Sequence, residues 1–219
     1  MFHDAEHLDL VAEEIVQGAF WNMGENCSAI SRLIVHKDIR EPLLRCIQMR
    51  LNDWKTGDPL NPANHLGALI DPKHCAKVKR HLSEGALSGG VMEGPYLSPT
   101  LYGDAPNNKR AQEEIFGPVL SIITADSDEA TVKIANETDY GLTASVSSAN
   151  TNRALRAARE LRAGTVTVNC FGEGDITTPF GGYKHSGFGG RDNGLYAHDQ
   201  YCEVKTIWID LSDADARDR

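Results

Sequence analysis

The stretch FWNMGENCSAIS, from Phe20 to Ser31, decides how the rest of the chain is interpreted. Cys27 follows Gly24 and precedes the small residues Ser28 and Ala29, so a substrate carbonyl has room to approach its sulfur. A cysteine thiolate is a nucleophile that can form a covalent intermediate. The spacing alone favours a plainer alternative, which is a small buried cysteine at the end of a helix.

Two further stretches favour the nucleophile. They are EEIFGP, residues 113–118, and PFGGYKHSG, residues 179–187. Together with the cysteine stretch, and in the same order, they resemble the motifs of the NAD(P)-dependent aldehyde dehydrogenases. The resemblance runs from about Asp4 to Leu211. Because members of that family are considerably longer, it implies that this chain is the catalytic, C-terminal domain and lacks the N-terminal cofactor-binding part.

The resemblance implies chemical roles for individual residues. Cys27 would attack the aldehyde carbon, hydride would pass to NAD or NADP, and water would hydrolyse the resulting thioester to a carboxylic acid. Glu114 and Phe116 match the residues that hold the nicotinamide ribose and pack beside the nicotinamide ring. Lys77 matches a weaker contact near the adenosine ribose, whereas His74 stands where Gln is usual. The plain alternative for Glu114 and Phe116 is an acid and an aromatic before a Gly-Pro turn.

The resemblance also implies a substrate pocket around the cysteine, lined by Trp21, Asn26, Ser28, Phe171, Gly174 and Phe180. An aromatic residue at such a position is as often plain core as pocket wall. Asn26, Ser28, Glu173 and Asp175 are more polar than a tunnel for long alkyl aldehydes requires. These four residues favour a small polar or amino aldehyde as the substrate.

Two catalytic groups are expected to lie outside this chain. In the family, an Asn side chain that stabilises the oxyanion and a Glu that acts as general base both precede the matched segment. Loss of an oxyanion donor costs about 10²–10³ in rate, and loss of a base about 10²–10⁴. Glu25 is interpreted as structural, since the family accepts Gln at that position. The isolated chain is therefore expected to be impaired, and the alternative is a non-enzymatic truncated remnant that acts through oligomerisation or a partner chain.

The composition argues against several other classes of protein. The 219 residues carry a formal charge of −9, which argues against a nucleic-acid partner. No apolar run reaches the ~18–20 residues that cross a bilayer, and the N-terminal sequence lacks the layout of a signal peptide. The five cysteines and eight histidines are scattered, which favours reduced thiols in a cytoplasmic protein and gives no support to a metal site.

The pattern of apolar residues predicts an α/β layered domain with a largely parallel sheet. The apolar stripe from Leu8 to Phe20 predicts a helix, and Pro42 fits the first turn of a second helix. The continuous apolar run 119–124 has the length of a buried strand. Further helices are expected at 72–84, from the caps at 126–128 to about 137, and at 151–162. On the last of these, the residues expected to face inward are Ala154, Leu155, Ala158 and Leu161. Further strands are expected at 32–36, 96–101, 143–147 and 165–170.

We expect a catalytic domain over residues 1–200, an oligomerisation strand over 201–211 and a flexible tail over 212–219. The segment EVKTIWIDL, from Glu203 to Leu211, is rich in β-forming residues. It resembles the strand that extends a neighbouring subunit's sheet in the family. Because an unpaired edge strand tends to pair with another chain, a homo-oligomer is predicted.

Overall fold

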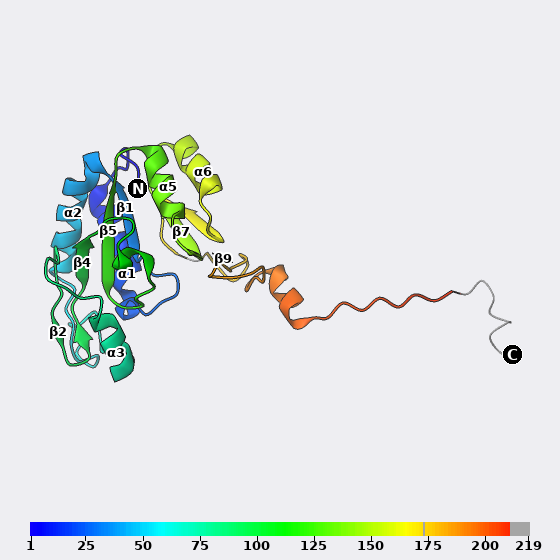
Figure 1. Cartoon of the computed structure of the whole chain (residues 1–219), viewed down its shortest axis with the longest axis horizontal. Coiled ribbons are helices and arrows are strands. Elements are labelled where there is room, and N and C mark those ends of the chain that lie inside the picture. Colours follow the sequence, from blue (N-terminus) through cyan, green and yellow to red (C-terminus); the bar gives the residue numbers. More distant parts are fainter. Residues whose placement is uncertain (173, 211–219) are drawn as a thin grey trace.

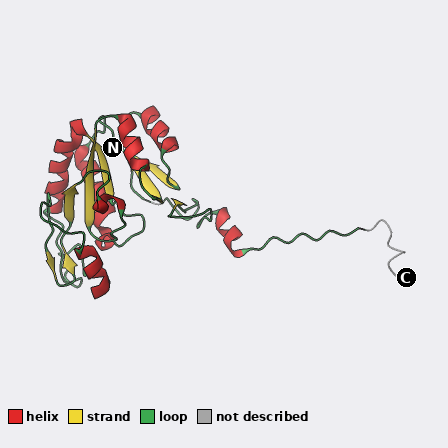
Figure 2. Cartoon of the chain, viewed as in Figure 1, coloured by secondary structure: helices red, strands yellow, loops and turns green. Residues whose placement is uncertain are grey.

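A computed structural model describes residues 1–172 and 174–210 (Figures 1 and 2). Its central element is a parallel sheet in the order β1-β5-β4, formed by Arg32–His36, Val119–Ala125 and Thr100–Gly103. The middle strand, β5, is almost wholly buried, as a continuous apolar run predicts. The strands predicted at 32–36 and 119–124 are therefore confirmed.

Two helices pack together to form the main core with this sheet. α1, Leu8–Phe20, buries Val16 and Phe20 in a cluster that also contains Leu43 of α2, Lys37–Leu51. The stripe predicted for α1 is confirmed. Because the end of α1 is fixed in the core, the loop that carries Cys27 starts from a rigid support.

A second, smaller sheet pairs β7, Thr143–Val146, with β8, Thr165–Val168, again in parallel. α6, Thr151–Glu160, connects these two strands, and α5, Asp128–Asn136, precedes them and contacts β1 and β5. The largely parallel α/β class is confirmed. The parallel strands are divided between two sheets, however, and do not form one.

The remaining elements are α3 at Pro72–Lys79, β2 at Met92–Glu93, β3 at Tyr96–Leu97, α4 at Lys109–Gln112, β6 at Tyr140–Gly141, β9 at Tyr183–Lys184, and the 3-10 helices η1 at Trp21–Gly24 and η2 at Leu195–Tyr201. The antiparallel pair β6–β9 matters most for the site, because it brings the motif of residues 179–187 beside the segment that leads into β7. None of the described helices is both long and apolar enough to span a membrane.

The structure corrects the predicted start of α2. Pro42 lies inside the helix and not in its first turn, because α2 begins at Lys37, directly after β1. The His36 side chain accepts a hydrogen bond from the Asp38 N–H at 3.3 Å, and Ile39 is buried in the main core. The cap and the burial of this additional turn outweigh the one hydrogen bond that proline cannot donate.

The predicted end of α3 is also wrong. The helix ends at Lys79 and does not reach residue 84. The backbone beyond it bonds to other parts of the chain. The Tyr102 hydroxyl accepts from the Ser83 N–H at 3.0 Å and donates to the Ser83 carbonyl at 2.9 Å. These bonds replace the helical ones.

On α6 one predicted inward residue faces solvent. Ala154 and Ala157 are buried, whereas Leu155 is 44% exposed. The two alanines pack in a cluster with Phe2 and Val146. The buried face of α6 is thus set by contacts with distant residues that the local pattern does not reveal.

The expected oligomerisation strand is not a strand in this single chain. Residues 202–210, here called the C-terminal arm, extend away from the body without regular secondary structure (Figure 1). Its apolar side chains are exposed, with Val204 at 99% and Trp208 at 89%. Leu211 and the expected tail at 212–219 lie outside the described residues. A strand needs a partner to bond, so the predicted pairing and the domain limits stay predictions.

Candidate active site

The loop of Cys27 leaves α1 through a left-handed turn. Asn22 and Met23 have φ values of 52° and 58°, and Gly24 follows with 67°. This backbone conformation is strained for residues with a side chain, so the turn must be held by its surroundings. The Asn22 side-chain amide donates to the Glu25 carbonyl at 3.0 Å, and the Asn22 carbonyl accepts from the Glu25 N–H at 2.9 Å.

The Cys27 loop lies directly against a second loop, residues 113–118. A Cβ atom on Gly24 would come within 2.5 Å of the Gly117 carbonyl oxygen. Gly24 is therefore required both for its positive φ and for this close approach. Two motifs that are far apart in the sequence are in backbone contact here.

Asn26 and Ser28 build the turn that carries Cys27. The Asn26 side-chain oxygen accepts from the Ser28 N–H at 3.3 Å and from the Ser28 hydroxyl at 3.2 Å. Ser28 is only 3% exposed, whereas Cys27 is an exposed thiol. The plain alternative of a buried cysteine at a helix end is wrong for Cys27.

His74 of α3 bridges the two loops. Its Nε2–H donates to the Phe116 carbonyl at 2.6 Å, and the same nitrogen lies 3.3 Å from Glu25 Oε1. That carboxylate oxygen also accepts from the Ile70 N–H at 3.0 Å. The side chains of His74 and Glu25 are only 13% and 9% exposed. Glu25 is thus engaged in contacts that fix the loop, and His74 is a bridge that the sequence pattern did not reveal.

The second loop carries the two residues that the motif assigns to the cofactor. Glu114 is exposed, while Phe116 is half-buried. Phe116 has a φ of 61°, and its ring meets the His74 ring edge to face with centroids 6.3 Å apart. A left-handed aromatic residue indicates a backbone that its neighbours constrain.

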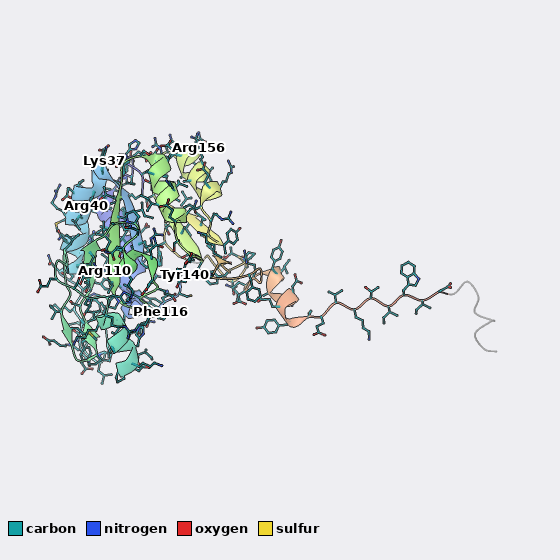
Figure 3. The ribbon with its side chains drawn as sticks, viewed as in Figure 1. Lys37, Arg40, Arg110, Phe116, Tyr140 and Arg156 are labelled. Atoms are coloured by element: carbon teal, nitrogen blue, oxygen red, sulfur yellow. The ribbon has the colours of Figure 1, made fainter. Side chains whose placement is uncertain are left out.

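A cavity of about 470 Å³ opens beside the two loops. This volume suits a small ligand. Phe116 and Tyr140, both labelled in Figure 3, lie on its wall. The predicted site residues that line it are Cys27, Asn26, Ser28, Glu114, Phe116 and Phe171.

Other predicted residues are not among the described residues that line this cavity, namely Trp21, Lys77, Gly174 and Phe180. Trp21 is 60% exposed at the start of the left-handed turn. Phe180 is held elsewhere, because its N–H and carbonyl both bond to Asp192 at 2.7 Å. Glu173, which entered the argument for a polar substrate, lies outside the described residues.

Tyr140 and His185 are cavity residues that the sequence motifs did not identify. Their rings meet edge to face with centroids 6.4 Å apart, and both line the cavity. Lys184 supports this wall, because its amine donates to the carbonyls of Asn136 and Thr138, each at 2.8 Å. Burial lowers the pKa of this amine. The sequence feature that could have identified His185 is the motif 179–187, to which it belongs. In the structure His185 lines the cavity, whereas Phe180 of the same motif does not.

His3, His36 and Asp128 are the one group among the described residues whose side chains could offer three metal ligands, with ligand atoms within 4.8 Å of one another. The fold brings together histidines that are scattered in the sequence. Arg153 already pairs with Asp128 at 2.8 Å and with Asp4 at 2.6 Å. We therefore interpret the group as an ionic network that joins α5, α6 and the N-terminal segment.

Comparisons with known proteins agree with the motifs. Residues 1–207 match the aldehyde dehydrogenase family. The aminoacetaldehyde dehydrogenase of Pseudomonas aeruginosa is 54% identical over 220 residues, which cover 97% of this chain and 44% of that protein. The chain belongs to the aldehyde dehydrogenase family. It spans less than half the length of this relative.

Solved aldehyde dehydrogenase structures have the same fold. KauB from Pseudomonas aeruginosa is 41% identical with a TM-score of 0.90, and the match covers 96% of this chain and 45% of KauB. A variant of the P. syringae AldA indole-3-acetaldehyde dehydrogenase, in complex with NAD+ and IAA, is 42% identical with a TM-score of 0.90 over 96% of this chain and 45% of AldA. The predicted fold of aldehyde dehydrogenase type is confirmed.

Proposed function

We propose that this chain forms the catalytic part of an aldehyde dehydrogenase that oxidises an aldehyde to a carboxylic acid, with Cys27 as the nucleophile. One observation carries the proposal. The exposed Cys27 and the residues assigned to the cofactor, Glu114 and Phe116, lie on two interlocked loops and line one cavity. The reaction requires that the nucleophile and the hydride acceptor meet the same carbon atom.

The chemistry at Cys27 proceeds in three steps. Its thiolate attacks the aldehyde carbon, a C–S bond forms, and the carbonyl oxygen becomes an oxyanion, for which the Cys27 backbone N–H is the proposed donor. The carbonyl bond then re-forms as the hydride leaves, which produces a thioester. Water cleaves the thioester, releases the carboxylic acid and restores the thiol. NAD(P)+ supplies the hydride acceptor when it is bound.

The residues of the second loop fit the nicotinamide end of the cofactor. The exposed carboxylate of Glu114 can accept hydrogen bonds from two ribose hydroxyls, and the constrained ring of Phe116 can pack beside the nicotinamide. Lys77 lies on α3, one turn beyond His74. It stays a proposed contact for a part of the cofactor outside the cavity.

We infer that the substrate is a small polar or amino aldehyde. Asn26 and Ser28 line the cavity next to Cys27 with polar side chains, whose oxygen atoms hydrogen-bond to each other. The relative named aminoacetaldehyde dehydrogenase supports this class of substrate. A wall of this polarity is less suited to a long alkyl chain.

Cysteine labelling on the purified chain tests both proposals. Iodoacetamide is added, and the labelling rate of each cysteine is measured by peptide mass spectrometry, alone and with aminoacetaldehyde or octanal. Aminoacetaldehyde should slow the labelling of Cys27 several-fold and more than octanal does. Cys170 and Cys202 are also exposed thiols and should be unaffected, which makes them internal controls.

Turnover is measured on the same sample as the appearance of NADH or NADPH. Cys27→Ser should abolish any aldehyde-dependent turnover, since serine is a far weaker nucleophile. Turnover that survives in this variant would contradict the role of Cys27. Equal protection of Cys27 and Cys170 by aldehyde would contradict a substrate site at the cavity.

The exposed C-terminal arm favours a second candidate function. Val204, Ile207 and Trp208 are highly exposed. They belong to an extended segment, which is the form of an edge strand without a partner among the described residues. A non-enzymatic chain that acts by association would show neither turnover nor aldehyde protection of Cys27. It would still associate through the arm.

A further inference from the structure

One oxygen of Asp128, in the ionic network of α5 and α6, has no hydrogen-bond partner. Arg153 Nε pairs with Asp128 Oδ2 at 2.8 Å, and the same guanidinium also pairs with Asp4. The other oxygen, Oδ1, is buried and makes no hydrogen bond within the part of the chain that the structure describes. A buried carboxylate oxygen normally has a partner, so this atom needs a proton donor or a cation.

His3 faces this oxygen at a distance that is long for a hydrogen bond. Its Nδ1 lies 3.4 Å from Asp128 Oδ1, whereas a charge-assisted N–H···O bond measures about 2.7–2.9 Å. Two atoms bound to one tetrahedral zinc ion at about 2.0–2.2 Å lie about 3.3–3.6 Å from each other. The separation of Nδ1 and Oδ1 therefore suits two ligands of one metal ion better than the two ends of a hydrogen bond.

His36 supplies a third ligand from the end of β1. Its ring meets the His3 ring edge to face with centroids 5.2 Å apart, and the ligand atoms of His3, His36 and Asp128 all lie within 4.8 Å of one another. The His36 side chain is only 9% exposed, so the core holds it in place. The His3 side chain is 43% exposed, so it can turn to close the remaining distance.

Asp38 lies where it can orient the His36 ring for a metal ion. His36 Nδ1 is 3.3 Å from the Asp38 backbone nitrogen and 3.4 Å from Asp38 Oδ2. When His36 binds a metal through Nε2, the ring proton sits on Nδ1, and the Asp38 carboxylate can accept it. A carboxylate is a usual second partner of a metal-bound histidine.

The charges and the ligand types favour zinc. Asp4 and Asp128 are negative and Arg153 is positive, so the network keeps a net negative charge when the histidines are neutral. Two imidazoles and a carboxylate suit Zn²⁺, with water in the fourth position. Hard ions such as Mg²⁺ and Ca²⁺ prefer sites built from oxygen ligands.

We propose that His3, His36 and Asp128 bind one zinc ion, which fastens the N-terminal segment to the end of β1 and the start of α5. Figure 1 shows these three parts of the chain side by side. None of the three residues lines the cavity beside Cys27, so the site is separate from the proposed thiol chemistry. The ion stabilises the folded chain, because the unfolded chain does not bring the three ligands together.

A zinc titration of the full chain under reducing conditions tests the site. Isothermal titration should show a saturable site for one ion per chain, and the imidazole NMR signals of His3 and His36 should shift while those of His198 stay unchanged. Because the chain has five cysteines, Co²⁺ is titrated in parallel. Its visible spectrum should lack the charge-transfer band of a cysteine thiolate.

Single substitutions separate the ligands from other histidines. His3→Gln and His36→Gln should each weaken zinc binding at least about tenfold, the lower limit for disturbing even an outer partner of a metal ligand. Both should also remove the rise in the urea midpoint that zinc causes in the wild type. His198→Gln, at an exposed histidine, should change neither result.

His3→Gln is the decisive variant, because its partly exposed side chain leaves the core intact and the variant should fold as the wild type does without zinc. Equal zinc affinity of His3→Gln and wild type would overturn the proposal. Absence of saturable binding would do the same, since a proton would then bridge His3 and Asp128. A thiolate band in the cobalt spectrum would assign the metal to a cysteine and would also overturn it.

Discussion

Gly24 determines how closely the nucleophile loop approaches the loop of Glu114 and Phe116. Its left-handed backbone and its position against the Gly117 carbonyl are separate requirements. Gly85 provides a comparison, because its φ is +88° and a Cβ atom there would meet nothing within 4 Å. Substitutions at the two glycines therefore separate the effect of the contact from the effect of backbone strain.

Gly24→Ala should be the more damaging of the two substitutions. Both cost about 1–3 kcal/mol for an unfavourable backbone conformation, but only Gly24→Ala also pushes the two loops apart. We expect a larger drop in the urea midpoint than for Gly85→Ala and a loss of aldehyde protection at Cys27. Equal drops, with protection intact in both variants, would show that the contact with Gly117 is unimportant.

His74 offers a second test at the scale of single residues. His74→Ala leaves the Phe116 carbonyl and the Glu25 carboxylate without their shared partner, which should cost about 1–3 kcal/mol of unfolding free energy. Hydrogen exchange at Ile70, whose N–H donates to Glu25, should become faster. His74→Gln retains a donor and should recover part of the loss. Lys73→Ala, on the exposed side of α3, serves as the control.

At the scale of elements, Asp4 ties the N-terminal segment to the connection between β7 and α6. Its carboxylate accepts from the Ser148 hydroxyl at 2.8 Å and from the Asn150 N–H at 3.1 Å, and it pairs with Arg153 at 2.6 Å. Partial burial would raise the pKa of Asp4, but the Ser148 hydroxyl and the Arg153 guanidinium outweigh it and lower the pKa. The ionised form is therefore favoured in the folded chain.

Asp4→Asn should destabilise the chain by about 1.5–3 kcal/mol at neutral pH, the range for hydrogen bonds to a charged group. A folded-state pKa below the unfolded value contributes stability above the unfolded pKa, and this stability is lost as the pH falls through the folded pKa. The difference between wild type and Asp4→Asn in urea denaturation should therefore shrink in acid. A difference between wild type and Asp4→Asn that stays constant as the pH falls would refute the argument.

The elements also show where a sequence pattern stops being sufficient. The stripe of α1 and the apolar run of β5 were predicted correctly, because each reflects burial of one element over its own length. The start of α2 and the inward face of α6 were not. Pro42 suggested a helix start, but α2 begins one turn earlier because Ile39 is buried in the core. The buried face of α6 depends on Phe2, which is distant in the sequence.

At the scale of the whole molecule, the C-terminal arm makes association the main expectation. Its exposed apolar residues and extended form should drive pairing with another copy. Light scattering of the full chain should give a mass above that of a monomer, and a chain that ends at Tyr201 should be monomeric. Leu60→Asp removes another highly exposed apolar residue and should not change the mass. A monomeric full chain at high concentration would contradict the prediction.

The sequence by itself determined the family and the α/β class and predicted Cys27 as the nucleophile, because motifs and apolar periodicity are properties of residues close together in the chain. Only the tertiary structure placed Gly24 against Gly117, His74 between the two loops, and Tyr140 beside His185. The physical reason is that a local pattern states which face of an element is apolar, whereas the partner of that face is chosen by long-range packing and backbone pairing.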